Sequence, residues 1–395
     1  MNLIVISVYY PPNNSSTAVQ ISNLVDELAI QGHFINIITQ DNTINKSFVC
    51  EESRNIRVYR FKVGNLNNKN LLKRAINEFL MPLKIISTII LNSLNLRFND
   101  GIICWSPTIF FTPLVIYLKF INRCKCYLIL RDIFPKWAWD LKLIKNKFIY
   151  AHLNFFFLFQ CFFSDIVGVQ SNNNKKFIPK KILFKKTNID VLNNWYTPKN
   201  KDQNLEIDFS KTCLNKRKIF IHAGNIGLAQ GFQVFIDVAE ILKDNNEIGF
   251  LFIGRGTQFD EMKKITKKKS LTNILFLDQI PNSKIICLYS KCFCGIVSLD
   301  KLHKTHNIPG KLISYLHGGL HVFALVNSGN DIIDLFKKYK IGLATDNHDP
   351  IFISNMIYKL SQKDLYQEKY GERSKIIANK FFNTKKIANQ IINYF

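Results

Sequence analysis

Short apolar runs alternate with helical patterns along the whole chain. The first run is Leu3–Val8, followed by a polar loop, a helical pattern over Ala18–Ala29 and a second apolar run at Ile35–Thr39. A strand, a helix and a strand in this order predict a βαβ unit with parallel strands. Further strands of the first part of the chain are predicted at Ile56–Phe61, Gly101–Cys104, Tyr127–Leu130 and Ile166–Val169.

The same alternation starts again after residue 216. The strands predicted there are Lys218–His222, Ile248–Ile253, Ile274–Leu277, Cys294–Val297 and Val322–Leu325. Residues 196–216 lack periodicity and are predicted to link two domains, because polar residues without a period are typical of loops. A length of 395 residues suits two α/β domains, placed at 1–195 and 217–375, with a last helical pattern at 376–395.

The chain is strongly basic. Its 53 Lys and Arg outnumber 29 Asp and Glu, giving a net charge of +24, and the excess occurs in both halves. A field of this sign attracts nucleic acid, anionic lipid headgroups or phosphorylated small molecules, although compositional drift in a chain rich in Lys, Asn, Ile and Phe explains part of it. An apolar fraction of 47% predicts a folded protein rather than a disordered one.

Three apolar segments stand out at Phe79–Leu96, Ile109–Ile121 and Phe148–Phe163. Each is too short or too interrupted to predict a spanning helix. The first and last are flanked by Lys and Arg, which favours helices lying at a membrane surface over ordinary core helices. The nine cysteines show no disulfide or zinc spacing, and the first residues do not resemble a signal peptide, so we expect a cytoplasmic protein.

The most informative loop follows the predicted strand at 218–222. Gly224, Gly227 and Gly231 lie between this strand and a helix, where glycines let main-chain amides approach a diphosphate. Their spacing is GxxGxxxG, unlike the GxGxxG of nicotinamide-binding domains. Gly254 and Arg255 close the next strand, so the Arg255 guanidinium is a candidate diphosphate ligand, with an exposed surface arginine as the alternative.

Lys311 begins a predicted helix, a position that is unfavourable for a cation unless an anion lies beside it. It is the second candidate for binding a diphosphate. In the first domain, Arg131 and Asp132 follow a strand and are candidates for binding a phosphate and for accepting a proton, with an internal ion pair as the equally weighted alternative.

The loop with Ser15, Ser16 and Thr17, and the aromatic ring of Trp105, follow two other strands of the first domain and are candidates for binding an acceptor sugar. No metal site is predicted. His303 and His306 have no further ligand at a suitable spacing, and no Asp-x-Asp follows a strand.

The chain resembles glycosyltransferase family 4, retaining enzymes of the GT-B fold, and more narrowly the N-acetyl-L-fucosamine transferases of bacterial O-antigen and capsule clusters. The most specific matches are RDIFPKWA and IPGK. Others are YYPPNNSSTAVQISNLVDELAIQGHFINIIT, CWSPTIFF, VGVQSNNNKKF, NNWYTP, GNIGLAQGFQVFIDVAEIL and FLFIGRGTQFDEMKK. They are spread over nearly the whole chain in the expected order.

The resemblance implies two facing Rossmann-like domains, with the C-terminal helix (376–395) crossing back to the first. It implies a UDP-sugar donor bound without a metal or other cofactor in the second domain, an undecaprenyl-diphosphate-linked saccharide acceptor, and a cytoplasmic enzyme on the inner membrane. Two departures concern the donor site. The usual Glu-x7-Glu is replaced by His306 and Ser314, and the usual Arg and Lys of the glycine loop by Asn225 and Gln230. Asn225, Gln230 and Ser314 are nevertheless expected to line the donor site together with Gly224, Gly227 and Gly254, and Asp331 is a candidate for binding a donor hydroxyl.

Two rival functions are weighed against sugar transfer. A UDP-sugar 2-epimerase is also built from two such domains, but it would require carboxylates and histidines that converge on one site, and the sequence does not show them. A basic nucleic-acid-binding protein would require basic residues interleaved with aromatic ones, whereas the basic residues here are dispersed.

Overall fold

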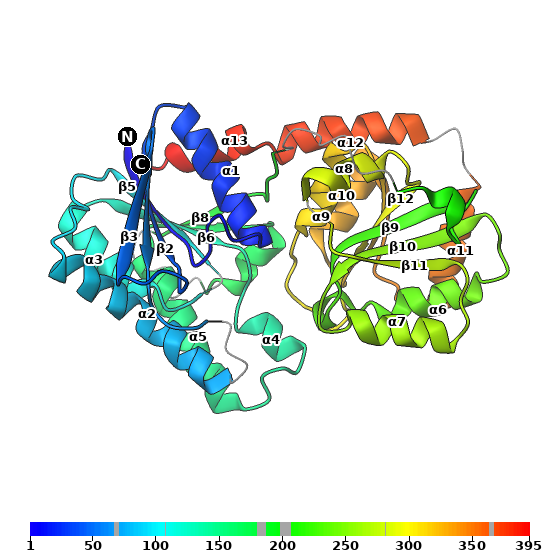
Figure 1. Cartoon of the computed structure of the whole chain (residues 1–395), viewed down its shortest axis with the longest axis horizontal. Coiled ribbons are helices and arrows are strands. Elements are labelled where there is room, and N and C mark those ends of the chain that lie inside the picture. The colour runs from blue at the N-terminus through cyan, green and yellow to red at the C-terminus, as the bar shows by residue number, and fades with distance from the viewer. Residues whose placement is uncertain (67–70, 107, 180–186, 198–206, 281, 363–366) are drawn as a thin grey trace. The chain divides into compact units, whose positions relative to one another are not determined.

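The computed structural model describes residues 1–66, 71–106, 108–179, 187–197, 207–280, 282–362 and 367–395. The chain forms two compact units (Figure 1). The first contains Met1–Asn193 and Thr384–Phe395, and the second contains Asn194–Asn383. The second unit is therefore inserted, in sequence, into the first.

The first unit is built on an eight-stranded sheet in the order β3-β4-β2-β1-β5-β6-β7-β8. Its strands are β1 (Asn2–Ile6), β2 (Phe34–Gln40), β3 (Phe48–Ser53), β4 (Ile56–Phe61), β5 (Gly101–Trp105), β6 (Lys125–Leu130), β7 (Ile166–Val169) and β8 (Asn188–Val191). All pair in parallel except β3, which is antiparallel to β4. Its helices are α1 (Ser16–Ile30), α2 (Leu71–Leu91), α3 (Thr112–Asn122), α4 (Lys136–Asp140), α5 (Lys147–Phe163) and α13 (Thr384–Ile392), with a 3-10 turn, η1, at Asn173–Phe177.

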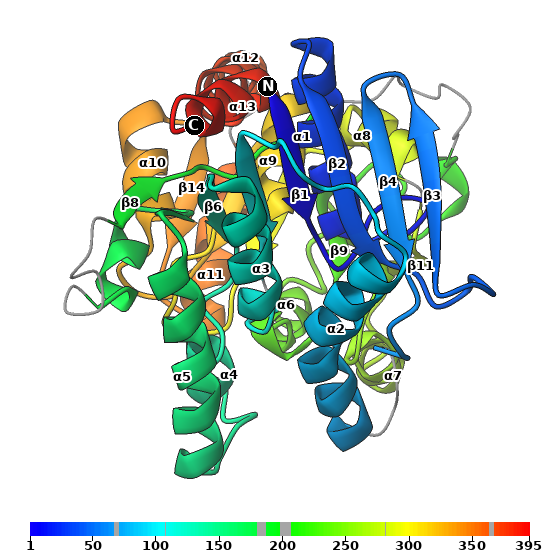
Figure 2. The same ribbon diagram turned by 90° about the vertical axis from the view of Figure 1, so that its left-hand side faces the viewer.

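Helices cover both faces of this sheet. Alternate strand residues such as Ile4, Cys104 and Leu128 form one core with α2, α3 and α5, which lie in front of the strands in Figure 2. Helix α1 packs on the other face, and α13 packs on α1. The central strands, such as β1, β5 and β6, are buried on both faces, which explains why they appear in the sequence as continuous apolar runs.

The second unit has a six-stranded, fully parallel sheet in the order β11-β10-β9-β12-β13-β14. Its strands are β9 (Lys218–Asn225), β10 (Ile248–Arg255), β11 (Ile274–Asp278), β12 (Cys294–Ser298), β13 (His321–Leu325) and β14 (Gly342–Thr345). Its helices are α6 (Gln233–Ile241), α7 (Phe259–Lys268), α8 (Asn282–Tyr289), α9 (Gly310–His317), α10 (Asp331–Tyr339), α11 (Pro350–Ser361) and α12 (Gln367–Phe381), with 3-10 turns η2 (Phe209–Lys211) and η3 (Leu228–Gln230).

Two hydrophobic cores sandwich the second sheet. Residues of α8, α9, α10 and α12 form one core with strand residues such as Ile221 and Leu251. Residues of α6, α7 and α11 form the other with strand residues such as Phe220 and Phe250. In chain order the strands run 3-2-1-4-5-6, the arrangement of a Rossmann-like domain, so the predicted α/β fold class is confirmed.

Several sequence-based boundaries differ from the structure. The units divide at 193/194 and 383/384, whereas the sequence placed the limits at 195 and 375. The segment 196–216 was predicted to be a linker, yet Leu214 is buried in a core of the second unit and the Tyr196 amide donates to the carbonyl of Phe382, while 198–206 lies outside the described residues. The tail, predicted as one helix, is two helices, α12 and α13.

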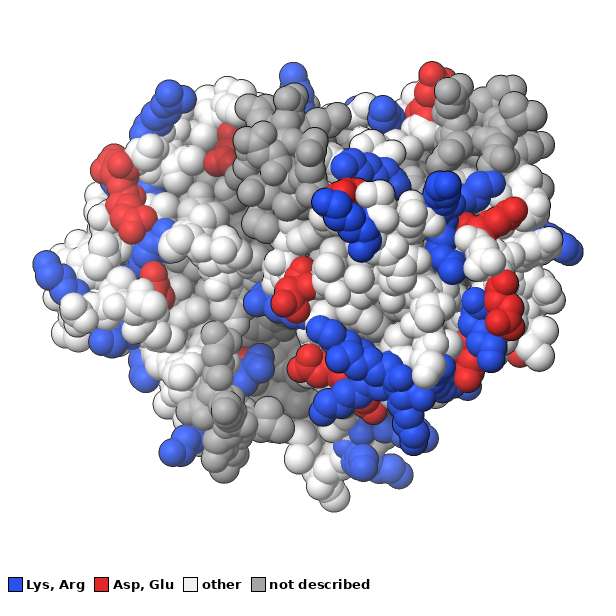
Figure 3. Space-filling model, turned by 45° about the vertical axis from the view of Figure 1, so that its right-hand side comes forward, with Lys and Arg blue, Asp and Glu red and all other residues white. Residues whose placement is uncertain are grey.

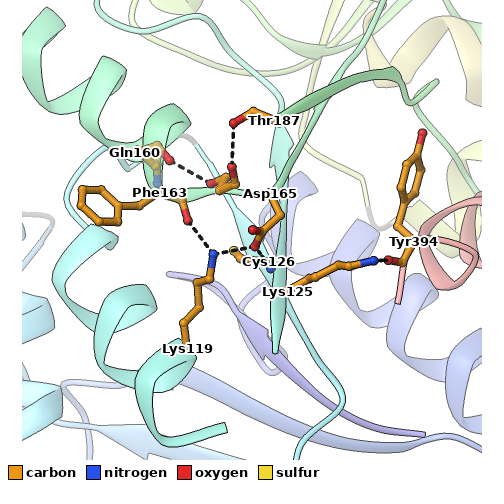
Figure 4. Close-up of polar contacts among 9 residues, drawn as sticks. Lys119, Lys125, Cys126, Gln160, Phe163, Asp165, Thr187 and Tyr394 are labelled. Carbon is orange, nitrogen blue, oxygen red and sulfur yellow. Dashed lines mark hydrogen bonds and ion pairs between the residues drawn. The ribbon is translucent and has the colours of Figure 1, made fainter. Parts of the chain in front are cut away.

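A network of polar contacts lies at the amino-terminal ends of two strands of the first sheet (Figure 4). The Asp165 carboxylate accepts hydrogen bonds from Lys119 Nζ at 2.6 Å and from the Cys126 amide at 2.7 Å. Nearby, Lys125 Nζ donates to the carbonyl of Tyr394 at 2.9 Å. The network joins α3 and the C-terminal segment to the starts of β6 and β7. It therefore lies at the opposite edge of the sheet from the carboxyl ends of the strands, and it is at the carboxyl ends that ligands bind in folds of this kind.

Candidate active site

The strands of the second sheet separate between β9 and β12. Their pairing extends only over Phe220–Cys294 and Ile221–Gly295. Beyond it, the Ala223 amide donates to the hydroxyl of Tyr315 on α9 at 2.8 Å instead of to a strand. The strand order reverses at this point, and ligands of open α/β sheets bind in the crevice outside the carboxyl ends of such strands.

The loops after β9 and β10 press closely against each other. A Cβ placed on Gly254, which has φ +153°, would lie 1.9 Å from the carbonyl oxygen of Gly224, and the Ile226 amide donates to the carbonyl of Arg255. Gly254 is therefore required by backbone packing. This contact brings the exposed Arg255 to a position paired with Asn225, next to the glycine loop.

Lys311 lies beside the glycine loop. Its Nζ is 3.6 Å from where a Cβ of Gly224 would be, and 2.9 Å from Nε2 of His222. Burial lowers the pKa of Lys311 to about 7. Among the described residues, no Asp or Glu forms an ion pair with it. A half-buried amine without a carboxylate partner is suited to bind an anion.

The side chains of Asn225 and Gln230 form hydrogen bonds within the loop. Gln230 Oε1 accepts hydrogen bonds from Asn225 Nδ2 and from the Gly227 amide, both at 3.0 Å. The Ser298 hydroxyl donates to the Gln230 carbonyl at 2.6 Å. The prediction that the Gly227 amide and Gln230 bind the donor therefore needs correction, since they bind each other. The next two amides, of Leu228 and Ala229, begin η3.

Two other predicted donor ligands have local roles. Ser314 lies inside α9, where its hydroxyl donates to the Lys311 carbonyl at 3.0 Å and lies 3.1 Å from the Tyr289 hydroxyl. These contacts place the Ser314 hydroxyl within the helix packing, and its predicted contact with the donor stays a prediction. Asp331 is half-buried at the first residue of α10, where its negative charge complements the helix dipole. Its predicted contact with a donor hydroxyl stays a prediction.

In the first unit, Trp105 does not offer a face to a sugar. Its ring is only 1% exposed, and the Arg131 guanidinium lies over it at 5.4 Å, so the predicted stacking role is corrected to a packing role. Burial lowers the pKa of Arg131 to about 10, with nearby Asp132 opposing that shift. Arg131 Nη1 is buried with no hydrogen-bond partner among the described residues, which fits the predicted phosphate contact.

The serine loop begins α1. The Ser15 hydroxyl accepts a hydrogen bond from the Ala18 amide at 3.3 Å and caps the helix, so this group is already engaged in the fold. Ser16 is exposed and Thr17 half-buried. Asp132 is half-buried two residues after β6, beyond the carboxyl end of the strand. Their predicted contacts with an acceptor stay predictions.

Sequence reasoning missed one residue of the site, His222. Its ring is buried at the end of β9, directly against Lys311. In the sequence it is the last residue of an apolar strand, and only its place just before the glycine loop distinguishes it from a core position.

The second unit matches a known protein family model. Residues 204–376 match the family model described as glycosyl transferases group 1. The model matches most of the unit that contains Gly224, Arg255 and Lys311, and the predicted GT-B architecture also agrees with solved structures.

One curated protein is similar to the chain in sequence, and two solved structures are similar to it in fold. "Probable glycosyltransferase WbjE" of Pseudomonas aeruginosa is 22% identical over 149 residues, a stretch that covers 38% of this chain and only 37% of that protein. Sucrose-phosphate synthase of Thermosynechococcus elongatus has a TM-score of 0.76 at 14% identity, covering 100% of this chain and 98% of that one. Anabaena HepE in complex with UDP and glucose has a TM-score of 0.65 at 12% identity, covering 100% and 99%.

Proposed function

We propose that the protein is a glycosyltransferase that takes its sugar from a UDP-sugar bound in the second unit. The observation that carries the proposal is the Lys311 amine, held beside Gly224 at the point where the strand order reverses. Support comes from the family model that matches this unit and from the structural similarity to HepE, whose structure contains UDP and glucose.

In this proposal the diphosphate of the donor lies against Gly224 and the first amides of η3, where the turn offers main-chain donors. Lys311 and Arg255 offset the charge that develops on the leaving phosphate, and the acceptor attacks on the same face, so the anomeric configuration is retained. The leaving phosphate accepts the proton of the acceptor hydroxyl, and no metal is required because the two cations supply the positive charge.

The acceptor in our proposal is an undecaprenyl-diphosphate-linked saccharide, and the sugar is an N-acetylated deoxyhexose such as N-acetylfucosamine. The pathway is assembly of an O-antigen or capsule polysaccharide. The names of WbjE and of a further structural relative, "WaaG, a glycosyltransferase involved in lipopolysaccharide biosynthesis", support this class of pathway. Arg131, whose Nη1 is buried with no partner among the described residues, is proposed to bind an acceptor phosphate.

The first unit is proposed to bind the cytoplasmic face of the inner membrane through α2 and α5. No helix in the described ranges is long and apolar enough to span a bilayer. Phe148 and Phe155 of α5 are nevertheless 86% and 59% exposed, and Phe79 of α2 is 44% exposed. Exposed Lys145 and Lys147 lie beside them, and apolar side chains next to basic ones are typical of helices that lie in an anionic headgroup layer.

The direct test is transfer from radiolabelled UDP-sugars to a membrane lipid extract. Arg255→Ala and Lys311→Ala are each expected to reduce turnover at least tenfold, because removing a group that stabilises charge in a transition state typically costs about 100-fold. Lys263→Ala is the matched control, since it removes an exposed cation from α7, a helix with several exposed lysines. Figure 3 shows Lys and Arg side chains gathered on one face of the molecule. Unchanged turnover in both site variants would contradict the proposal.

The two rivals give different results in the same assay. A UDP-sugar 2-epimerase would convert the UDP-sugar without any lipid acceptor, and a nucleic-acid-binding protein would retain DNA or RNA on a filter at physiological salt. Label that appears in the lipid fraction only when donor and lipid are both present favours transfer over either rival.

A further inference from the structure

His222 bridges three groups at the end of β9. Its Nδ1 lies 3.3 Å from the carbonyl oxygen of Ile296 on β12. Its Nε2 lies 2.9 Å from Lys311 Nζ and 3.3 Å from the carbonyl oxygen of Asn225. The ring of Phe232 packs against the imidazole with ring centroids 4.5 Å apart. The orientation of the imidazole is therefore fixed from several sides.

The imidazole is neutral in these surroundings. Burial, and then the charge of Lys311, lowers the pKa of His222 well below its usual value. A neutral ring carries one N–H. On Nε2, that N–H could donate to the Asn225 carbonyl, but it would lie against the ammonium and leave the Nδ1 lone pair facing the Ile296 carbonyl oxygen. On Nδ1, it donates to Ile296, and the Nε2 lone pair can accept a hydrogen bond from Lys311 at 2.9 Å, a closer contact than the 3.3 Å that separates Nε2 from the Asn225 carbonyl oxygen.

We propose that His222 is a positioning residue: in its Nδ1–H form it accepts a hydrogen bond from Lys311 and holds the ammonium beside Gly224, ready for the donor diphosphate. This inference rests on the proposed function for its ligand, but its geometry concerns His222 and Lys311 alone. Without an acceptor at Nε2, a flexible lysine side chain would have to be ordered by the diphosphate itself, at a cost in affinity.

A purely structural role is the alternative. His222 also joins β9 to β12 at the place where the two strands separate, and such a bridge would stabilise the fold without affecting ligand binding. The two roles are distinguished by whether the effect of His222 depends on Lys311.

The first test needs no ligand. Nitrogen-15 NMR of the histidine rings in the full chain, with the His222 signals assigned by their loss in His222→Phe, reports which ring nitrogen carries the proton. We expect Nδ1 to be protonated and Nε2 to be unprotonated at pH 6.5. A proton on Nε2, or on both nitrogens, would overturn the proposal whatever the protein binds.

The second test measures UDP binding by calorimetry at pH 6.5, below the pKa of Lys311. We expect His222→Phe to weaken binding about tenfold, because a hydrogen bond to a charged group contributes about a factor of ten. Lys311→Met should weaken it at least as much, and the double variant His222→Phe/Lys311→Met no further than Lys311→Met alone, since His222 acts through the amine.

His321→Phe is the matched control. His321 is a buried histidine of the same unit, packed between the rings of Phe293 and Tyr370 at the start of β13, and its replacement should leave UDP binding unchanged. Additive losses in the double variant, or an equal loss in the control, would overturn the positioning role. If the unaltered protein does not bind UDP, the proposed function fails, while the NMR test still decides the tautomer and with it this inference.

Discussion

The Lys311 amine destabilises the fold in the absence of a ligand. Burial lowers its folded-state pKa from 10.5 to about 7, so the unfolded chain binds the proton more tightly between these values. We expect Lys311→Met to raise the free energy of unfolding by ~1–2 kcal/mol at pH 7, a figure reduced from the full pKa shift because the side chain is only half-buried. The midpoint of thermal unfolding should rise by a few degrees.

The stability that Lys311→Met adds should depend on pH in a defined direction. The destabilisation of the folded state by the Lys311 amine is greatest below pH 7, where the amine is protonated in both the folded and the unfolded chain. It decreases as the pH rises from 7 to 10.5 and is absent above pH 10.5, where the amine is neutral in both. The stability difference between Lys311→Met and the unaltered protein should therefore shrink from pH 7 to pH 10. A difference that grows over this range would contradict the burial of the amine.

Gly254 gives a second prediction. Gly254→Ala should destabilise the second unit by ~3 kcal/mol, because the new Cβ would lie 1.9 Å from a main-chain oxygen and the residue has a positive φ. Gly329→Ala is the matched control, since Gly329 also has a positive φ but its new Cβ would meet only an ordinary contact at 3.6 Å. Urea unfolding of both variants measures the difference, and equal losses would show that strain in φ alone accounts for the effect.

At the scale of elements, the exposed phenylalanines of α5 predict membrane binding. The double variant Phe148→Ser/Phe155→Ser should reduce sedimentation with phosphatidylglycerol vesicles at least tenfold, because each exposed ring that enters the headgroup layer contributes ~1.5 kcal/mol or more. Ile351→Ser on α11 removes a comparably exposed apolar side chain, 63% exposed, from the second unit and should change nothing. Equal effects of the two changes would indicate nonspecific hydrophobic adsorption to the vesicles instead of a defined membrane-binding surface.

Most strands that could be predicted from sequence lie inside the sheets and are buried on both faces; β11 is an edge strand whose apolar run nevertheless revealed it. The missed strands, β3, β8 and β14, all lie at sheet edges, where fewer neighbours bury them. β3 is exposed for most of its length and contains Glu51 and Glu52. An edge strand does not need a continuous apolar run, so apolar runs alone do not reveal it.

The residues of the candidate site that could be predicted are those whose type is unusual at their position unless a ligand binds there. Glycines before a helix and a lysine at a helix start indicated Gly224 and Lys311, and the structure brings the two together. Sequence could not show that Gln230 satisfies the Gly227 amide, or that His222 faces the lysine, because both contacts depend on how the loop folds back. Side-chain partners set by tertiary packing are not encoded in local pattern.

At the scale of the whole molecule, the C-terminal segment belongs to the first unit. Ile387, Ala388 and Ile391 of α13 are buried, and Gln390 donates to the Asp190 carboxylate at 2.8 Å. Ending the chain after Asn383 should lower the unfolding temperature of the first unit by several degrees or more, because it exposes the surface of α1 that α13 covers.

Scanning calorimetry measures this effect if the two units unfold in separate transitions. The transition of the second unit, identified by its shift to lower temperature in Gly254→Ala, should stay unchanged in the shortened chain. A shift confined to the second unit would contradict the assignment of α13 to the first.

The insertion of one unit into the other also affects biosynthesis. As the ribosome delivers the chain from its amino end, all eight strands of the first sheet emerge before the second unit, but α13 and the Phe395 ring that packs over Gly101 emerge after it. The second unit can thus reach its native state during translation, whereas the first completes its packing only after α13 has also emerged. Nascent chains are therefore most exposed to chaperones and proteases through the unit that was made first.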